Sequence, residues 1–302
     1  MDNNVLLVSP SPHIRFKHST TTIMLDVIIA LCPALIASVI LFGLRALAVI
    51  AVCVSVCVLS EWLFELICKR DVTVGDLSAV VTGIILALNL PVRIPLWQAA
   101  VGSIVAIVVV KQLFGGIGCN FANPAITARI VMVLSFSATM SDFSTKVDAI
   151  SSATPLSGGE MPSYLDLFLG RHGGSLGETC ALAILIGGAY LLIRHVITWH
   201  TPVVYIGTVA LFSLALGEDP LAAILTGGVM FGAFFMATDY STTPHTKWGK
   251  VVFGLGCGLI TVLIRVFGSY PEGVSFAILF MNILTPYIGK WTRKKVFGGV
   301  KK

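Results

Sequence analysis

Ten long apolar runs occupy most of the chain, and they limit its possible folds more than any other feature. Most of them approach the roughly 20 residues that cross a bilayer as a helix. Of the 302 residues, 56% are hydrophobic and only 12% are charged, whereas about 25% of an average soluble domain is charged. A globular core could not bury so much apolar surface, which excludes a soluble enzyme, a disordered chain and a secreted disulfide scaffold. We therefore predict an all-α integral membrane protein with about ten transmembrane helices, at residues 23–42, 46–68, 75–90, 94–113, 121–138, 179–194, 198–216, 220–238, 250–267 and 273–289.

The runs fall into two sets of five, and short motifs recur between the sets. Ala79-Val-Val-Thr82-Gly83 in the third run resembles Ala223-Ile-Leu-Thr226-Gly227 in the eighth. Gly118-x-x-Phe121-Ala122 opens the fifth run, and Gly273-x-x-Phe276-Ala277 opens the tenth. Because each set holds an odd number of helices, the second set is expected to be inverted. We predict two inverted five-helix repeats, similar in architecture to urea transporters, within the segments 1–22, 23–138 (first repeat), 139–178 (loop), 179–289 (second repeat) and 290–302 (basic tail).

The distribution of basic residues predicts the orientation of the chain. If residues 1–22 are cytoplasmic, 14 of the 20 Lys and Arg residues face the cytoplasm, 5 face outward and Arg129 lies within a run. Cytoplasmic loops are enriched in Lys and Arg, so both termini are predicted to be cytoplasmic and the 139–178 loop extracytoplasmic. The net charge of +5 then reflects orientation, and no nucleic-acid partner is expected. Residues 1–22 contain no long apolar stretch, so we predict no cleaved signal peptide.

The loop between the two sets contains one segment of small residues, Asp148-Ala-Ile-Ser151-Ser152-Ala153-Thr154-Pro155. Small neighbours leave the Thr154 hydroxyl accessible to a second protein. Pro155 disfavours helix at Thr154 and keeps the segment extended. Taken alone, such a segment is typical of an ordinary Ser/Thr turn.

The same segment resembles the flavin-attachment sequence Ser-x-Ala-Thr of the membrane subunits shared by Rnf complexes and sodium-pumping quinone reductases. One small departure is Ser152, where many relatives have glycine. Further stretches, in the expected order along nearly the whole chain, resemble the D subunits of Rnf complexes: Ser9-Pro-Ser-Pro-His13, Lys111-Gln-Leu-Phe-Gly-Gly-Ile-Gly-Cys-Asn120, Asn123-Pro124-Ala125, Gly232-Ala-Phe-Phe-Met-Ala-Thr-Asp239 and Leu263-Ile-Arg265-Val-Phe-Gly268 running on to Asn282 and Pro286.

The resemblance implies FMN joined to Thr154 through a phosphoester, with Asp148, Ser151, Ser152 and Ala153 around it. It also implies a second, noncovalent flavin, riboflavin. The implied function is to relay electrons between ferredoxin and NAD in a complex that moves Na⁺ or H⁺ across the inner (plasma) membrane of a prokaryote. The chain has no NAD fingerprint and no ferredoxin-type cysteine run. The implied partners are therefore a second covalent-flavin subunit, iron–sulfur membrane subunits, an NAD-binding subunit and a flavin transferase.

Arg129 is the charge that the sequence places deepest, eight residues into the fifth run. A charged group inside a membrane is costly and is a functional candidate by default. We hypothesise that Arg129 pairs with an anionic flavin ring or phosphate; the alternative is a salt bridge to Glu61 or Glu65. Asn120 and Arg265 lie in the stretches that carry the resemblance, and we predict that they also contact the cofactor.

Glu61 and Glu65 lie one turn apart near the end of the second run. Paired carboxylates suit protons or sodium ions, so they could form a cation relay. The alternative, which we favour, is a solvated helix end. The seven cysteines include no CxxC pair, and no metal site is predicted.

Two other functions compete with the flavin-carrying subunit. A permease with an inverted repeat and no cofactor would account for the repeated motifs and for the fifth run, which follows the glycine-rich residues 115–118 and contains Pro124. It would not account for the Thr154 segment or for Arg129. The quinone-reducing homologue is less favoured because that branch usually has a longer N-terminal extension than the 22 residues here.

Overall fold

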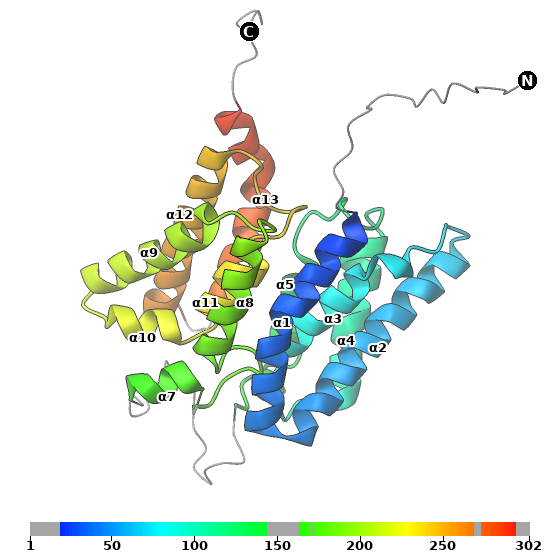
Figure 1. Cartoon of the computed structure of the whole chain (residues 1–302), viewed down its shortest axis with the longest axis horizontal. Coiled ribbons are helices and arrows are strands. Elements are labelled where there is room, and N and C mark those ends of the chain that lie inside the picture. Colours follow the sequence, from blue (N-terminus) through cyan, green and yellow to red (C-terminus); the bar gives the residue numbers. More distant parts are fainter. Residues whose placement is uncertain (1–18, 144–162, 171, 269–272, 294–302) are drawn as a thin grey trace, which may run out of the picture.

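The computed structural model describes residues 19–143, 163–170, 172–268 and 273–293, which form helices and loops with no strand among them. Two groups of helices lie side by side (Figure 1). The first group contains α1 (Thr20–Phe42), α2 (Leu44–Ile67), η1 (Val74–Asp76), α3 (Ser78–Leu88), α4 (Leu96–Ile104), η2 (Val105–Gln112), α5 (Pro124–Ser135) and α6 (Ser137–Met140). The second contains α7 (Tyr164–Leu169), α8 (Ala181–Ile193), α9 (His200–Ala215), α10 (Pro220–Leu225), α11 (Val229–Phe231), η4 (Gly232–Met236), α12 (Lys247–Phe267) and α13 (Val274–Thr292).

Each predicted apolar run coincides with helical structure, and the all-helical class is confirmed. Within the described residues, α1, α2 and α12 are long and apolar enough to cross a membrane, and several shorter helices are also apolar. Large apolar side chains stand on the surface; Ile40 is 76% exposed and Leu44 82%. A soluble monomer rarely exposes such contiguous apolar surface, whereas lipid covers it.

The two ends of the bundle differ in what they carry. Helix α1 begins and α13 ends at one end of the bundle, which we call the terminal end (Figure 1). Helix α7, which lies within the predicted loop of residues 139–178, is at the opposite end, which we call the α7 end. The segment of the loop that holds Thr154 lies outside the described residues.

Side-chain caps fix where helices begin. The side chain of Asn123 accepts hydrogen bonds from the backbone N–H groups of Ala125 and Ile126, and Pro124 occupies the first helical position of α5. Asp219 and Pro220 start α10 in the same way. Asn or Asp before the first turn satisfies otherwise unpaired N–H groups, and proline has no N–H to lose there.

The eighth predicted run is a broken helix. The chain leaves the α-helical conformation after α10 at Thr226, and Gly227 and Gly228 have φ of +65° and +69°. Glycine adopts this left-handed region without steric cost. The matching motif Thr82-Gly83 lies inside the continuous helix α3. Prediction of a single segment at 220–238 was therefore wrong, and the two similar motifs have different backbones.

Helices α1 and α8 of the two groups touch through a glycine. A Cβ added at Gly187 of α8 would lie 2.0 Å from the carbonyl oxygen of Ala30 in α1. Small residues allow such close backbone approach in membranes. We expect Gly187→Ala to lower the free energy of unfolding by about 1–3 kcal/mol, because the helices must separate. Thermal unfolding of the purified protein in detergent measures this change.

Gly207→Ala is the matched control. Gly207 is also inside a helix, and no atom lies within 4 Å of its added Cβ, so alanine should leave stability unchanged or raise it by up to about 1 kcal/mol. Equal unfolding temperatures for the two variants would contradict the close α1–α8 contact.

Candidate functional site

Arg129 lies in the middle of α5 and is 3% exposed. Its Nη1 donates hydrogen bonds to Oδ1 of Asn89 at 3.0 Å and to Oγ of Ser275 at 3.1 Å. Asn89 ends α3, and Ser275 lies in the first turn of α13. Arg129 therefore joins three helices, and the alternative of a salt bridge to Glu61 or Glu65 is wrong.

A loop segment enters the bundle beside this arginine. The N–H of Leu176 donates to the carbonyl of Leu90, and that of Gly177 donates to Leu88 at 2.7 Å. A Cβ on Gly177 would lie 2.6 Å from Cβ of Leu88, so the segment follows the end of α3 closely. This contact brings the following residue, Glu178, into the interior.

Glu178 is 5% exposed, and its Oε2 accepts a hydrogen bond from Ser175. Its charge acts on the guanidinium groups of both Arg129 and Arg265. A nearby opposite charge reduces the cost of burying a charged group. Glu178 was not predicted, because an acidic residue after a glycine-rich loop resembles an ordinary solvated charge.

Arg265 lies in the last turn of α12 and binds the broken helix. Its Nη1 donates to the carbonyl of Ala223, and its Nη2 donates to those of Thr226 and Gly227, at 2.7, 2.9 and 3.0 Å. These carbonyls end α10, where a cation is favourable. Nε of Arg265 is buried with no hydrogen-bond partner among the described residues. The same is true of Nε2 of His172 and Oγ1 of Thr179, whose side chains lie with that of Glu178 around Gly174.

We call Arg129, His172, Glu178, Thr179 and Arg265 the arginine cluster. Two of them, Arg129 and Arg265, were predicted, and the charge of Glu178 links them. Asn120 was also predicted, but it lies in the loop before α5 and not in this cluster; its Oδ1 is buried without a partner among the described residues. The predicted attachment residues lie outside the described residues: Asp148, Ser151, Ser152, Ala153 and Thr154.

A second site is a hollow near the terminal end. Two adjoining hollows share Met24, Ile117, Asp239 and Tyr240. The outer hollow, beside Gly118 and Ser241, has a volume of about 360 Å³, within the range of small-molecule sites, and the deeper one, beside Ile85, has a volume of about 100 Å³. Its wall is mostly apolar, with polar groups at a few positions; it includes Ile85, Leu191, Phe234, Phe235, Asn123 and Thr238.

Glycines shape the edge of this hollow. Gly115, Gly116 and Gly118 have φ of +118°, +92° and +83°, a region that other residues rarely enter. They end the preceding helix and carry Ile117 over the hollow. The chain therefore leaves the helix and changes direction at this glycine run.

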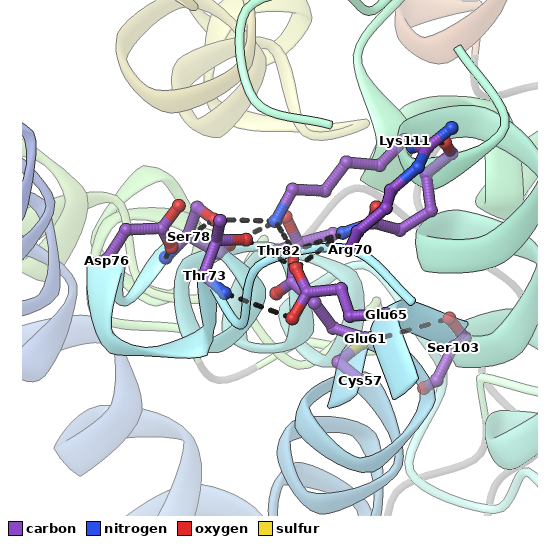
Figure 2. A network of polar contacts seen from close by, with 11 residues as sticks. Cys57, Glu61, Glu65, Arg70, Thr73, Asp76, Ser78, Thr82, Ser103 and Lys111 are labelled. Atoms are coloured by element: carbon purple, nitrogen blue, oxygen red, sulfur yellow. Dashed lines mark hydrogen bonds and ion pairs between the residues drawn. The ribbon is translucent and has the colours of Figure 1, made fainter. Parts of the chain in front are cut away.

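A third site lies beside the hollow and joins α2, η1, α3 and η2 (Figure 2). We call it the lysine cluster; its members are Glu61, Glu65, Arg70, Asp76, Ser78, Lys111 and Gln112. Nζ of Lys111 lies 2.5 Å from Oε1 of Glu61 and 2.5 Å from Oγ of Ser78. Lys111 and Glu61 are 2% and 0% exposed, and Glu65 is also buried. The interpretation of Glu61 and Glu65 as a solvated helix end is therefore wrong. Lys111 interrupts an apolar run, a signal that could have identified it.

Comparison with known proteins places these features in a family. The model of the NQR2, RnfD, RnfE family matches residues 7–298. The chain belongs to the NQR2, RnfD, RnfE family. It is 49% identical to the D subunit of the Na⁺-translocating ferredoxin:NAD⁺ oxidoreductase complex of Acetobacterium woodii, over 98% of this chain and 96% of that protein.

Two other members of the family are similar over the full length. The D subunit of the proton-translocating ferredoxin:NAD⁺ oxidoreductase complex of Clostridium ljungdahlii is 39% identical, over 98% of this chain and 97% of that protein. The D subunit of the ion-translocating oxidoreductase complex of Escherichia coli is 33% identical, over 97% and 99%. The family match covers the arginine cluster, the hollow and the lysine cluster, as well as the predicted attachment segment.

Proposed function

We propose that this chain is the flavin-carrying D subunit of an ion-translocating ferredoxin:NAD⁺ oxidoreductase complex, the Rnf complex. Near-full-length identity of 49% to the Acetobacterium woodii protein is the observation that carries the proposal. The chain relays electrons between ferredoxin and NAD while the complex moves Na⁺ or H⁺. The similar relatives are D subunits of such complexes, which favours this function over the quinone-reducing homologue.

Thr154 carries FMN as a phosphoester in this proposal, and small residues at Ser151, Ser152 and Ala153 give the transferase access. Bound flavin supplies one-electron chemistry that no side chain of this chain can supply. The arginine cluster supports an anionic group near the α7 end, because Arg129 and Arg265 are buried cations. The unpartnered Nε of Arg265 is a donor suited to a phosphate or to a flavin carbonyl.

The hollow near the terminal end is our proposed site for the second flavin, riboflavin. Apolar walls such as Phe234 and Ile85 suit a flat ring, and Asn123, Thr238 and Asp239 offer polar groups to its edge. Ile117 and Gly118 lie at the opening. Both termini are cytoplasmic in this proposal, so the hollow lies on the cytoplasmic side and the Thr154 loop on the outer side.

Filling the hollow is expected to displace the second flavin. Met24 lies in α1 and lines both hollows, so Met24→Trp should lower noncovalent flavin to less than about a tenth of the wild-type amount. Flavin released from the denatured complex and separated by chromatography measures this. Leu25→Trp is the control, because Leu25 is an exposed neighbour in the same helix; equal loss in both variants would contradict the placement.

The chain lies in the inner membrane as two inverted five-helix repeats, an arrangement supported by the two groups of helices in Figure 1. Its partners are a second covalent-flavin subunit, iron–sulfur membrane subunits and an NAD-binding subunit. A flavin transferase modifies the loop at 139–178 from the outer side.

Deletion and complementation test the function. Membranes from cells that lack only this chain should lose ferredoxin-dependent NAD⁺ reduction, and expression of the wild-type chain should restore it. Ferredoxin and NAD⁺ turnover by soluble enzymes in the same cells is the control. Full activity without the chain would contradict its place in the electron path.

A further inference from the structure

The lysine cluster is a continuous chain of polar contacts that the flavin chemistry does not use. Oγ of Ser78 donates to Asp76 and accepts from Lys111, which donates to Glu61. Nε2 of Gln112 donates to Oε1 of Glu61 at 2.7 Å and to Oε1 of Glu65 at 3.4 Å. Figure 2 shows the side chains of Ser78, Lys111 and Glu61 pointing toward one another.

The cluster carries one excess negative charge. Lys111 and Arg70 provide two positive charges, whereas Glu61, Glu65 and Asp76 provide three negative ones when ionised. Arg70 is bound to the carbonyl of Gln112. An excess charge in a site as buried as Glu61 is costly, and uptake of a single positive charge removes that cost. One net charge suits a monovalent cation better than a divalent one.

One carboxylate oxygen at this site has no donor. Oε1 of Glu61 accepts from Lys111 and Gln112, whereas Oε2 is buried with no hydrogen-bond partner among the described residues. The titratable groups that act on Glu61 are Lys111 from η2 and Asp76 from η1, with Cys57 one turn earlier in α2. None of these groups donates a hydrogen bond to Oε2. This oxygen is therefore the position at which a cation can bind.

The cluster also contacts an exposed residue, Thr73. The side chain and the N–H of Thr73 both donate to the carboxylate of Glu65, and Thr73 is exposed. Glu65 therefore stands between the surface and the more deeply buried Glu61. On the other side, Ser78 lines the hollow, so the cluster adjoins the proposed flavin site.

We propose that Glu61 and Glu65, with Lys111 as a built-in counter-cation, form an uptake site for one monovalent cation, a proton or Na⁺. The cation enters past Thr73 and Glu65 and binds at Oε2 of Glu61, which brings the cluster to zero net charge. Lys111 stays bound to Oε1 of Glu61 before and after the cation binds. One of the two glutamate charges is therefore always neutralised by the lysine. This role rests on the proposed function, because uptake matters only in an ion-translocating complex.

Carbodiimide labelling of the wild-type complex tests the site directly. Dicyclohexylcarbodiimide reacts with protonated carboxyl groups in apolar surroundings, and peptide mass spectrometry locates the adduct. We expect an adduct on Glu61 or Glu65. Labelling that falls when Na⁺ is added at constant pH identifies Na⁺ as the cation, and labelling that Na⁺ does not change at constant pH identifies the proton. Glu61 and Glu65 that stay unlabelled at every pH and Na⁺ concentration would overturn the proposal.

Transport by variants of the complex in liposomes gives the second test. Glu61→Gln should lower the ions moved per NADH formed by about tenfold or more, while covalent flavin and uncoupled electron transfer stay near wild type. Glu61→Gln with Lys111→Met removes both charges, avoids an unpaired buried ammonium and should show the same loss. Asp71→Asn, at an exposed carboxylate on the same loop, should leave transport unchanged.

The two failures are distinguishable. Transport at the wild-type ratio in Glu61→Gln, with intact flavin, overturns the cation site and leaves the electron-relay function standing. Loss of flavin or of electron transfer in the wild-type chain would instead contradict the proposed function, and the carbodiimide result would still report on the carboxylates.

Discussion

Thr154→Ala is expected to leave this protein without covalent flavin and to lower ferredoxin-dependent NAD⁺ reduction by about two orders of magnitude or more. Alanine removes the only atom that can form the phosphoester at this position, and a relay that lacks one carrier cannot be bridged by side chains. Flavin fluorescence of the protein in a denaturing gel and NADH formation by the membranes measure the two effects.

Thr145→Ala is the matched control for this prediction. Thr145 is a threonine of the same loop without the small-residue segment around it, so its loss should change neither flavin fluorescence nor NADH formation. Fluorescence that persists in Thr154→Ala, or that disappears equally in Thr145→Ala, would show that Thr154 is not the attachment residue.

Arg129→Lys is expected to have the second largest effect, a loss of about tenfold or more in electron transfer. Lysine cannot reproduce the planar guanidinium, so Asn89 and Ser275 cannot both keep their hydrogen bonds. Each buried polar group left unpaired costs about 1–3 kcal/mol. Arg129→Gln should be worse, because it also removes the buried positive charge that interacts with the charge of Glu178.

The measurements for Arg129 are NADH formation by membranes and thermal unfolding of the purified protein. Arg45→Lys is the control, since Arg45 is exposed and its guanidinium donates to a single carbonyl, that of Ile94. Electron transfer and flavin content that are intact in Arg129→Lys would refute the hypothesis that Arg129 serves the cofactor.

The sequence predicted the helices well because membrane helices are set by local composition. A transmembrane helix forms all of its backbone hydrogen bonds within itself and exposes apolar side chains to lipid over about 20 residues. Hydropathy along the sequence therefore locates it. The short third segment was predicted to stop before Pro91, and α3 ends at Leu88. The break at Thr226–Gly228 was missed, because an apolar run with two glycines is compatible with both a continuous and a broken helix.

Pairing between helices could not be predicted. Lys111 and Glu61 are 50 residues apart, and Arg129 and Ser275 are 146 apart. Which side chains meet depends on how each helix is rotated and crosses its neighbours, and hydropathy does not determine either. The burial of Arg129 was therefore predicted correctly, whereas its neutral partners, Glu178 and the Lys111–Glu61 pair became visible only in the structure.

Peptide mass spectrometry of the wild-type protein, made in cells that contain a flavin transferase, tests the central claim most directly. We predict that the peptide containing residues 148–156 carries the added mass of FMN on Thr154. An unmodified peptide, from cells in which the same transferase labels a known target protein, would contradict the account and favour a permease without a cofactor.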